Sequence, residues 1–148
     1  MSEHKNPGCT ADSIILYEKN LDFLKTKIPL VKRKNEPYKG FWALPGGFLN
    51  YGEETIEQCC VREDWEEIGL IIKLEDLELF GVYSDPLRDP RGHVTSHVYE
   101  ITTFSGTLKA GDDAAKVRLF ELGKLPPLAF DHEKITADYI KKYGVNNE

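Results

Sequence analysis

Residues 63–67, Glu-Asp-Trp-Glu-Glu, place four acidic side chains in five positions. If the segment is helical, Glu63, Glu66 and Glu67 are neighbours, because residues three and four apart share a side of the helix. Like charges at this spacing destabilise an isolated helix by ~0.2–0.5 kcal/mol per pair, so the cluster needs another reason. Three carboxylates with a nearby backbone carbonyl form an all-oxygen ligand set, which suits Mg²⁺ or Mn²⁺ and not zinc. The segment predicts a divalent-cation site.

A solvated helix face is the simpler interpretation of such a run, and two features favour the cation site over it. On a helical wheel the three glutamates extend the face formed by Ile56, Cys59 and Cys60, so they are expected to point toward the body of the domain. A Pro-Gly-Gly turn at 45–47 and a helix start lead directly into them.

The helix that must hold these acids has clear end signals. Thr55 is followed three residues later by Gln58, which is the pattern of a capping box, and Gly69 supplies a stop. These signals predict a helix from Thr55 to Ile68.

Short apolar runs elsewhere predict a chain with more strands than helices. A second helix is expected over 133–143, with Asp131 as its N-cap and Gly144 as its stop. Regular strand–helix alternation is absent, so we expect an α+β fold and no doubly wound parallel sheet. The length of 148 residues suits a single domain over 1–148. Strands are predicted at 13–17, 28–32, 41–44, 70–73, 77–83, 93–104 and 117–121.

Bulk composition narrows the class of partner. The net charge of -6 argues against non-specific binding to nucleic acid or to an anionic membrane. The three cysteines give no disulfide framework, and reduced thiols in a cytoplasmic protein are the simplest interpretation. The N-terminal residues have no apolar core of a signal peptide, and no apolar run approaches membrane-spanning length.

The acidic helix resembles the Nudix box, whose pattern is G, five residues, E, seven residues, then R-E-U-x-E-E-x-G-U, where U is a bulky apolar residue. Arg62 to Leu70 matches the second half, and the box covers residues 47–70. The chain departs from the pattern at two places. One extra residue lies within 48–53, and because Thr55 opens the helix we take Glu54 and not Glu53 as the motif glutamate. Asp64 stands where the pattern has an apolar residue, so it must reach solvent, pair, or join the metal cluster.

The resemblance implies a Nudix-type α/β/α sandwich with a mixed sheet between helices, and hydrolysis of a nucleoside diphosphate linked to another group. It implies that Mg²⁺ or Mn²⁺ is held by Glu63, Glu66, Glu67 and the Gly46 carbonyl. The implied catalytic set is Glu54, Arg62, Glu66 and Glu67, with Arg62 pairing with Glu54 or another helix acid. For the general base, Glu66 and Glu67 inside the box and Glu121 and Glu133 outside it are left open, the outer two more simply being surface charges.

Outside the box the chain resembles the subgroup that cleaves ADP-ribose. Pro86 lies sixteen residues after Leu70, and the segments Ser84–His93, KGFWALPGGF and LAFDHEKI are similar to that subgroup. The resemblance implies substrate contacts from Phe48, Pro86, Arg88 and Arg91. The two arginines could instead pair with Asp85 and Asp89 in a solvated turn. Phe48, Tyr51 and Phe130 are candidates for stacking on adenine, although core or turn packing is the simpler role for each.

The expected partner is a small-molecule nucleotide, with no nucleic acid and no membrane. Two alternatives remain: a Nudix hydrolase for NADH or a nucleoside triphosphate, and a non-catalytic ADP-ribose sensor. Many ADP-ribose hydrolases are homodimers, which leaves a homodimer open here, although the sequence carries no interface signal.

Overall fold

Strand β1 (Gly8–Ile15) lies inside the main sheet of the computed structural model, which describes residues 5–111 and 114–144. It pairs in parallel with β7 (Val94–Ile101) and antiparallel with β4 (Gly46–Phe48). β6 (Glu78–Tyr83) adds antiparallel to β7, so the order is β4-β1-β7-β6. This sheet is mixed, as the resemblance implied.

The remaining strands form two smaller antiparallel sheets. β2 (Lys27–Arg33) lies between β3 (Trp42–Ala43) and β9 (Ala114–Glu121). A short pair joins β5 (Leu70–Ile71) to β8 (Ser105–Gly106). The strands therefore form three separate sheets, and two 3₁₀ turns, η1 (Phe23–Lys25) and η2 (Leu74–Asp76), complete the regular elements.

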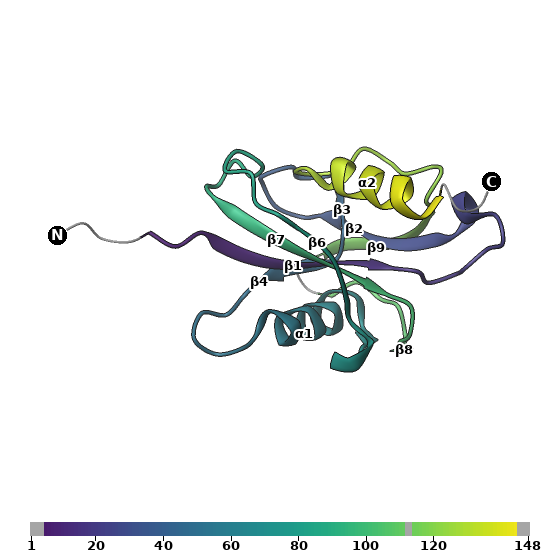
Figure 1. Ribbon diagram of the computed structural model, residues 1–148, viewed down its shortest axis with the longest axis horizontal. Helices are drawn as coiled ribbons and strands as arrows, with labels where there is room; N and C mark the ends of the chain where they lie inside the picture. Colours follow the sequence, from purple (N-terminus) through teal and green to yellow (C-terminus); the bar gives the residue numbers. More distant parts are fainter. Residues whose placement is uncertain (1–4, 112–113, 145–148) are drawn as a thin grey trace.

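Two helices cover opposite sides of these strands. In Figure 1, α1 (Ile56–Ile68) lies below the strands and α2 (His132–Gly144) lies above them. Each helix has its own buried apolar cluster: Cys59, Cys60 and Ile68 belong to one, and Ile135 and Tyr139 to the other. This arrangement confirms the α+β fold with a mixed sheet between helices.

The start of α1 agrees with the sequence prediction. The Thr55 hydroxyl accepts the Gln58 N–H at 3.1 Å, and the Gln58 side chain accepts the Thr55 N–H at 2.9 Å. Gly69 ends the helix at a φ of 77°, a left-handed conformation that glycine adopts without strain. Helix α2 includes Gly144, which was expected to be its stop, and its start also differs from the prediction. The Asp131 carbonyl accepts the Ile135 N–H, but both oxygens of its carboxylate bind Arg88.

The Pro-Gly-Gly segment was expected to be a turn at 45–47, but Gly46 and Gly47 belong to strand β4 and pair with β1, whose own start is Gly8 and not Ser13. The strand expected at 70–73 is also shorter and ends at Ile71. A Cβ at Gly46 would lie 2.1 Å from the Ala11 carbonyl oxygen, so only glycine allows the two backbones to approach this closely. This contact fixes the strand on which the acidic helix depends.

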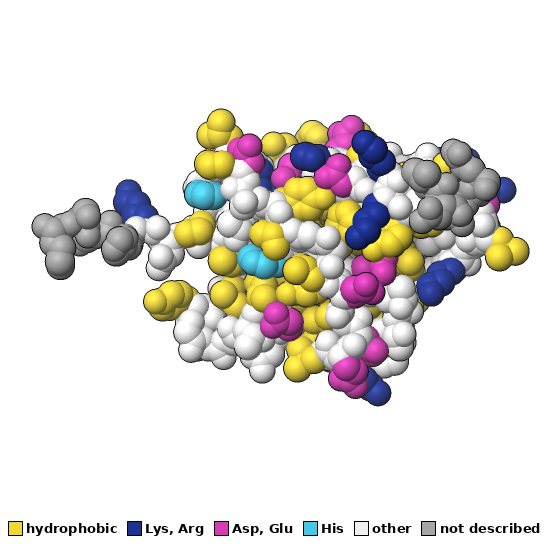
Figure 2. All heavy atoms as spheres, viewed as in Figure 1, with side chains coloured by type: hydrophobic (Ala, Val, Ile, Leu, Met, Phe, Trp, Pro, Cys, Tyr) yellow, Lys and Arg dark blue, Asp and Glu magenta, His cyan; other side chains and the backbone are white. Residues whose placement is uncertain are grey.

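β6 forms one edge of the main sheet. Leu79 and Val82 on this strand are about half exposed, at 54% and 49%. Figure 2 shows hydrophobic side chains gathered over the middle of this face, with charged side chains mostly around them. Within residues 5–111 and 114–144, neither helix has the length and apolar content needed to cross a membrane.

Candidate active site

Glu67, in the last turn of α1, connects the acidic helix to the glycine strand. Its Oε1 accepts the Gly46 N–H at 2.9 Å. Burial, together with the charges of Glu63, Asp64 and Asp12, raises the pKa of this carboxyl to about 8 against the effect of the Gly46 bond. An acid in this state gains most from a cation that restores its charged form.

Glu63 lies against the second glycine. A Cβ at Gly47 would come within 2.4–2.6 Å of three atoms of the Glu63 carboxyl group, so the absence of a side chain at this position makes room for the acid. Burial raises the pKa of Glu63, while its contact with Arg62 acts in the opposite direction. Glu63 and Glu67 therefore face the Gly46–Gly47 backbone from α1.

Glu66 does not share this inward direction, and the prediction that all three glutamates face the body of the domain was wrong for it. Its side chain is 56% exposed. The buried face of α1 contains Cys60, Asp64 and Ile68, which recur every four residues. Glu66 consequently lies at the solvent edge of the cluster.

Arg62 links the acids to the loop that precedes the helix. Its Nε and Nη2 bind both oxygens of Glu54 at 2.9 and 2.8 Å, while Nη1 binds Glu63 at 2.8 Å and Glu66 at 3.0 Å. The Arg62 contact lowers the pKa of Glu54 to about 2. The predicted pairing with Glu54 is confirmed, and it supports Glu54 and not Glu53 as the glutamate that follows the extra loop residue. We name Arg62 with these three glutamates the Arg62 clamp.

The donor set fits a divalent cation. Carboxylates with raised pKa values, beside glycines that leave the backbone accessible, are hard oxygen ligands of the kind Mg²⁺ prefers. Within the described part of the chain, no three acidic, histidine or cysteine side chains are already gathered as a metal cluster.

Asp64 is fully buried, which settles one question that the sequence left open. Its Oδ2 accepts hydrogen bonds from the Ser13 hydroxyl at 2.7 Å and the Cys60 thiol at 3.7 Å. Its Oδ1 is the one fully buried side-chain N or O atom without a partner among the described residues. Burial raises the pKa of Asp64 to about 8. The residue pairs with neighbours in the core and does not reach solvent.

Replacing Asp64 with asparagine is expected to weaken the pH dependence of stability. The pKa of Asp64 is about 8 when folded, against 3.8 as the ordinary value, so the folded protein binds more protons than the unfolded chain between these values. Stability must therefore fall as pH rises through this window. Urea unfolding with EDTA at pH 5 and pH 8.5 should show a drop that is ~1–3 kcal/mol smaller in Asp64→Asn than in the parent. Glu75→Gln, an exposed change, serves as the control, and equal drops in parent and Asp64→Asn would contradict the assignment.

A cavity opens beside Glu67. Its lining comes from β1, β2, β4, the end of α1, the loop 84–93 and the start of α2. Arginine and aromatic planes alternate along one wall: the Arg91 guanidinium lies 4.8 Å from the Phe48 ring centroid and 4.9 Å from that of Phe130. Arg33 lies 4.9 Å from the Phe130 centroid. Such planes stack on flat rings, and the guanidinium groups attract phosphates.

The structure brings some of the predicted substrate residues to this cavity. Phe48, Phe130, Arg88 and Arg91 line it. Arg91 also pairs with Asp89, as the alternative interpretation had it, whereas Arg88 pairs with Asp131 and not with Asp85 or Asp89.

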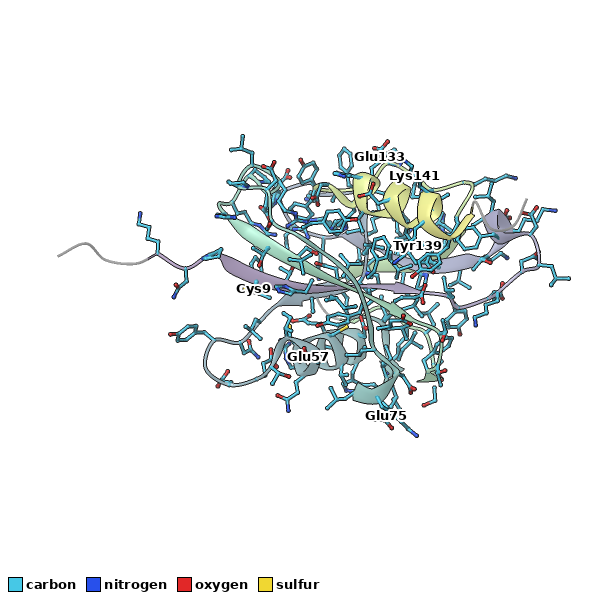
Figure 3. All side chains as sticks on the ribbon, viewed as in Figure 1. Cys9, Glu57, Glu75, Glu133, Tyr139 and Lys141 are labelled. Atoms are coloured by element: carbon cyan, nitrogen blue, oxygen red, sulfur yellow. The ribbon has the colours of Figure 1, made fainter. Side chains whose placement is uncertain are left out.

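Other candidates lie elsewhere. Pro86 and Tyr51 are exposed and do not line the cavity, and neither do Glu121 and Glu133. Figure 3 shows Glu133 on the side of α2 that faces away from the strands. The structure therefore does not support the two outer glutamates as general bases.

Three titratable side chains of the cavity were not found from the sequence: Asp12, Arg33 and His132. A signal existed for Asp12, because an acidic residue immediately before the apolar run of 13–17 is unusual unless it has partners. Arg33 was concealed within a basic segment. His132 follows Asp131 in a segment that was interpreted only as a helix start.

Comparison with known proteins places this geometry in a family. A model described as NUDIX domain matches residues 10–139. The chain is 53% identical over 136 residues to a Methanocaldococcus jannaschii protein named ADP-ribose pyrophosphatase, which covers 92% of this chain and 75% of that protein. It is 30% identical over 139 residues to an Acinetobacter baylyi protein named ADPR responsive transcriptional repressor NtrR, covering 90% of this chain but only 53% of the repressor.

A solved structure of a NUDIX domain has the same fold as this chain. The NUDIX domain of Shewanella oneidensis NrtR, complexed with ADP ribose, superposes with a TM-score of 0.80 at 25% identity. The match covers 94% of this chain and 90% of that one.

Proposed function

The chain belongs to the Nudix family, and from that premise we propose that it is an ADP-ribose pyrophosphatase. The observation that carries the proposal is the position of Glu67. This residue belongs to the acidic set around Gly46–Gly47 and also lines the cavity with the arginine and aromatic wall. A pyrophosphate at the acids would place one nucleoside end of the substrate in the cavity. The M. jannaschii relative supports ADP-ribose as that substrate.

The reaction adds water to one phosphorus of the pyrophosphate and breaks its bond to the bridging oxygen. The products are AMP and ribose 5-phosphate, and the proton of the attacking water passes to a base. We assign that role to Glu67, because its carboxylate lies where the acids around Gly46–Gly47 meet the cavity. Glu66 remains the alternative within the box.

The metal would be held by Glu63, Glu66, Glu67 and the Gly46 carbonyl. Mg²⁺ or Mn²⁺ bound there would neutralise phosphate charge and acidify water. Arg62 positions Glu63 and Glu66 from the side of the loop and fixes Glu54. Arg33 and Arg91 would attract the phosphates from the cavity wall.

Incubation with ADP-ribose and Mg²⁺, followed by chromatographic separation of the products, tests this function. We expect AMP and ribose 5-phosphate in equal amounts, and none when EDTA removes the metal. A panel with NADH and nucleoside triphosphates separates the other Nudix activities. Intact ADP-ribose after long incubation, together with tight binding of it, would instead favour the sensor that the repressor relative suggests.

A further inference from the structure

Two buried polar side chains that the proposed reaction does not use line the cavity beside Glu67. Asp12 comes from β1 and is 6% exposed, and His132 comes from the first turn of α2 and is 4% exposed. Neither belongs to the Arg62 clamp, but Asp12 lies against the same glycine as Glu67: a Cβ at Gly46 would come within 2.5 Å of its Oδ1. Each side chain has protein partners at one polar atom only, so its other polar atom is available to a group that enters the cavity.

Asp12 presents a hydrogen-bond acceptor to the cavity. Its Oδ2 accepts the hydroxyl protons of Thr10 at 2.7 Å and Ser96 at 2.5 Å. Its Oδ1 has no such partner among residues 5–111 and 114–144. Within those residues, Asp64 Oδ1 is the one side-chain oxygen or nitrogen that is both fully buried and without a partner, so Asp12 Oδ1 is not fully buried. Oδ1 therefore reaches the open space of the cavity beside Gly46, where it can accept a hydrogen bond.

His132 presents a donor to the same space. Its Nδ1 accepts the Leu44 backbone N–H at 3.0 Å, so that nitrogen carries no proton. Burial lowers the pKa of the ring, which keeps it neutral. A neutral imidazole that accepts at Nδ1 must carry its proton on Nε2. This Nε2–H has no hydrogen-bond partner among the described residues. It is not fully buried either, because Asp64 Oδ1 is the one fully buried side-chain atom without a partner there.

The shape and walls of the cavity favour a flat ring. Its volume of about 110 Å³ is well below the ~300–1,000 Å³ that encloses a whole drug-sized ligand, so only one end of a nucleotide fits inside. The planar groups of Phe48, Arg91 and Phe130 lie along one wall. A base can stack against such planes and present its edge to Asp12 and His132.

We propose that Asp12 and His132 read the edge of an adenine base and reject 6-oxopurines; this inference rests on the proposed function. Adenine presents an amino donor at N6 beside an acceptor at N7, whereas guanine presents acceptors at both O6 and N7. Hypoxanthine shares the O6 acceptor. The Asp12 carboxylate accepts from the N6 amino group, and His132 Nε2–H donates to N7. An O6 atom facing Asp12 would place two acceptors together with no proton between them.

Asp12→Asn tests this pairing with a change of one atom type. Thr10 and Ser96 donate to the side chain, so they retain the amide oxygen of the asparagine and turn its NH₂ group toward the cavity. The cavity-facing acceptor becomes a donor, which matches O6. Calorimetric titration with AMP and IMP in the presence of Mg²⁺ should show a preference for AMP of about 10- to 100-fold in the parent. In Asp12→Asn the ratio should fall to unity or reverse.

Asp138→Asn is the matched control, because Asp138 also accepts hydrogen bonds from neighbours but does not line the cavity. It should keep the parental AMP:IMP ratio. Equal binding of AMP and IMP by the parent overturns the inference whether or not the variant folds. The inference is also overturned if the parent does not discriminate between the bases but loses binding with 2′-deoxy-AMP. That result would assign Asp12 to the ribose. Because binding of AMP needs no hydrolysis, failure to cleave ADP-ribose would defeat the proposed function alone.

Discussion

Glu67→Gln is expected to lower kcat for ADP-ribose hydrolysis by about 10³-fold, at the upper end of the ~10²–10³ that the loss of one electrostatic group costs an enzyme. The amide retains an oxygen that can accept the Gly46 N–H, so the link between α1 and β4 is preserved. What disappears is the negative charge that would bind the metal and the basic oxygen that would accept a proton. The effect should appear in kcat more than in KM, because the cavity that binds the nucleoside end is unchanged.

The measurement is steady-state kinetics with Mg²⁺, beside Glu57→Gln as a control. Glu57 is an exposed acid on the same helix, and its Oε1 accepts the Tyr99 hydroxyl at 3.4 Å, a bond that the amide oxygen of glutamine can keep. The control should keep parental kinetics. Thermal melting in EDTA at pH 8.5 adds an independent readout: the glutamine variant should melt above the parent, because a buried carboxyl with a pKa of about 8 must ionise there in the folded parent. Parental kcat in Glu67→Gln would remove this residue from the reaction.

Arg62→Ala is expected to lower kcat/KM by about 10²-fold and to destabilise the fold by about 2–4 kcal/mol, somewhat less than the ~3–5 kcal/mol for breaking a fully buried ion pair. The Glu54 side chain is only 10% exposed and would lose both of its bonds to the guanidinium. Glu63 and Glu66 would lose the cation between them, so the acids would repel one another and the loop 48–54 would detach from α1.

Two further variants separate position from charge. Arg62→Lys keeps the charge but has no planar fork to bind Glu54 through two bonds, so an intermediate loss is expected. Arg62→Ala combined with Glu54→Gln should recover part of the stability, because the unpaired buried charge is gone. Urea unfolding and kinetics at pH 7.5 measure both quantities. If Arg62→Lys matched the parent in both, a simple point charge would suffice and the clamp geometry would be unnecessary.

Local signals carried the successful part of the sequence prediction. Helix α1 was located from Thr55, Gln58 and Gly69, whose roles depend only on residues a few positions away. The pairing of Arg62 with Glu54 was implied by the resemblance to the Nudix box, in which both residues occupy motif positions. The α+β class followed from the order of apolar runs, which needs no knowledge of their partners.

The errors concern contacts between distant segments. The direction of Glu66 depends on which side of α1 meets β1, and the presence of Asp64 on the buried side could not be inferred from an acidic residue. Gly46–Phe48 is a strand only because β1 lies beside it. Asp12 and His132 both line the cavity, but they come from segments at opposite ends of the chain. No rule of sequence spacing relates such segments.

The parallel pairing of β1 with β7 also governs when the protein can fold during synthesis. Residues 8–15 leave the ribosome early, but their hydrogen-bonding partners are residues 94–101. Until those emerge, an apolar strand that belongs in the interior of the sheet has one unpaired edge, which is a surface on which nascent chains aggregate. The central sheet therefore forms late and over a long sequence separation, a topology associated with slow folding. Asp12 lies in this unpaired strand, and an acidic side chain there lowers the tendency of the segment to aggregate before the sheet forms.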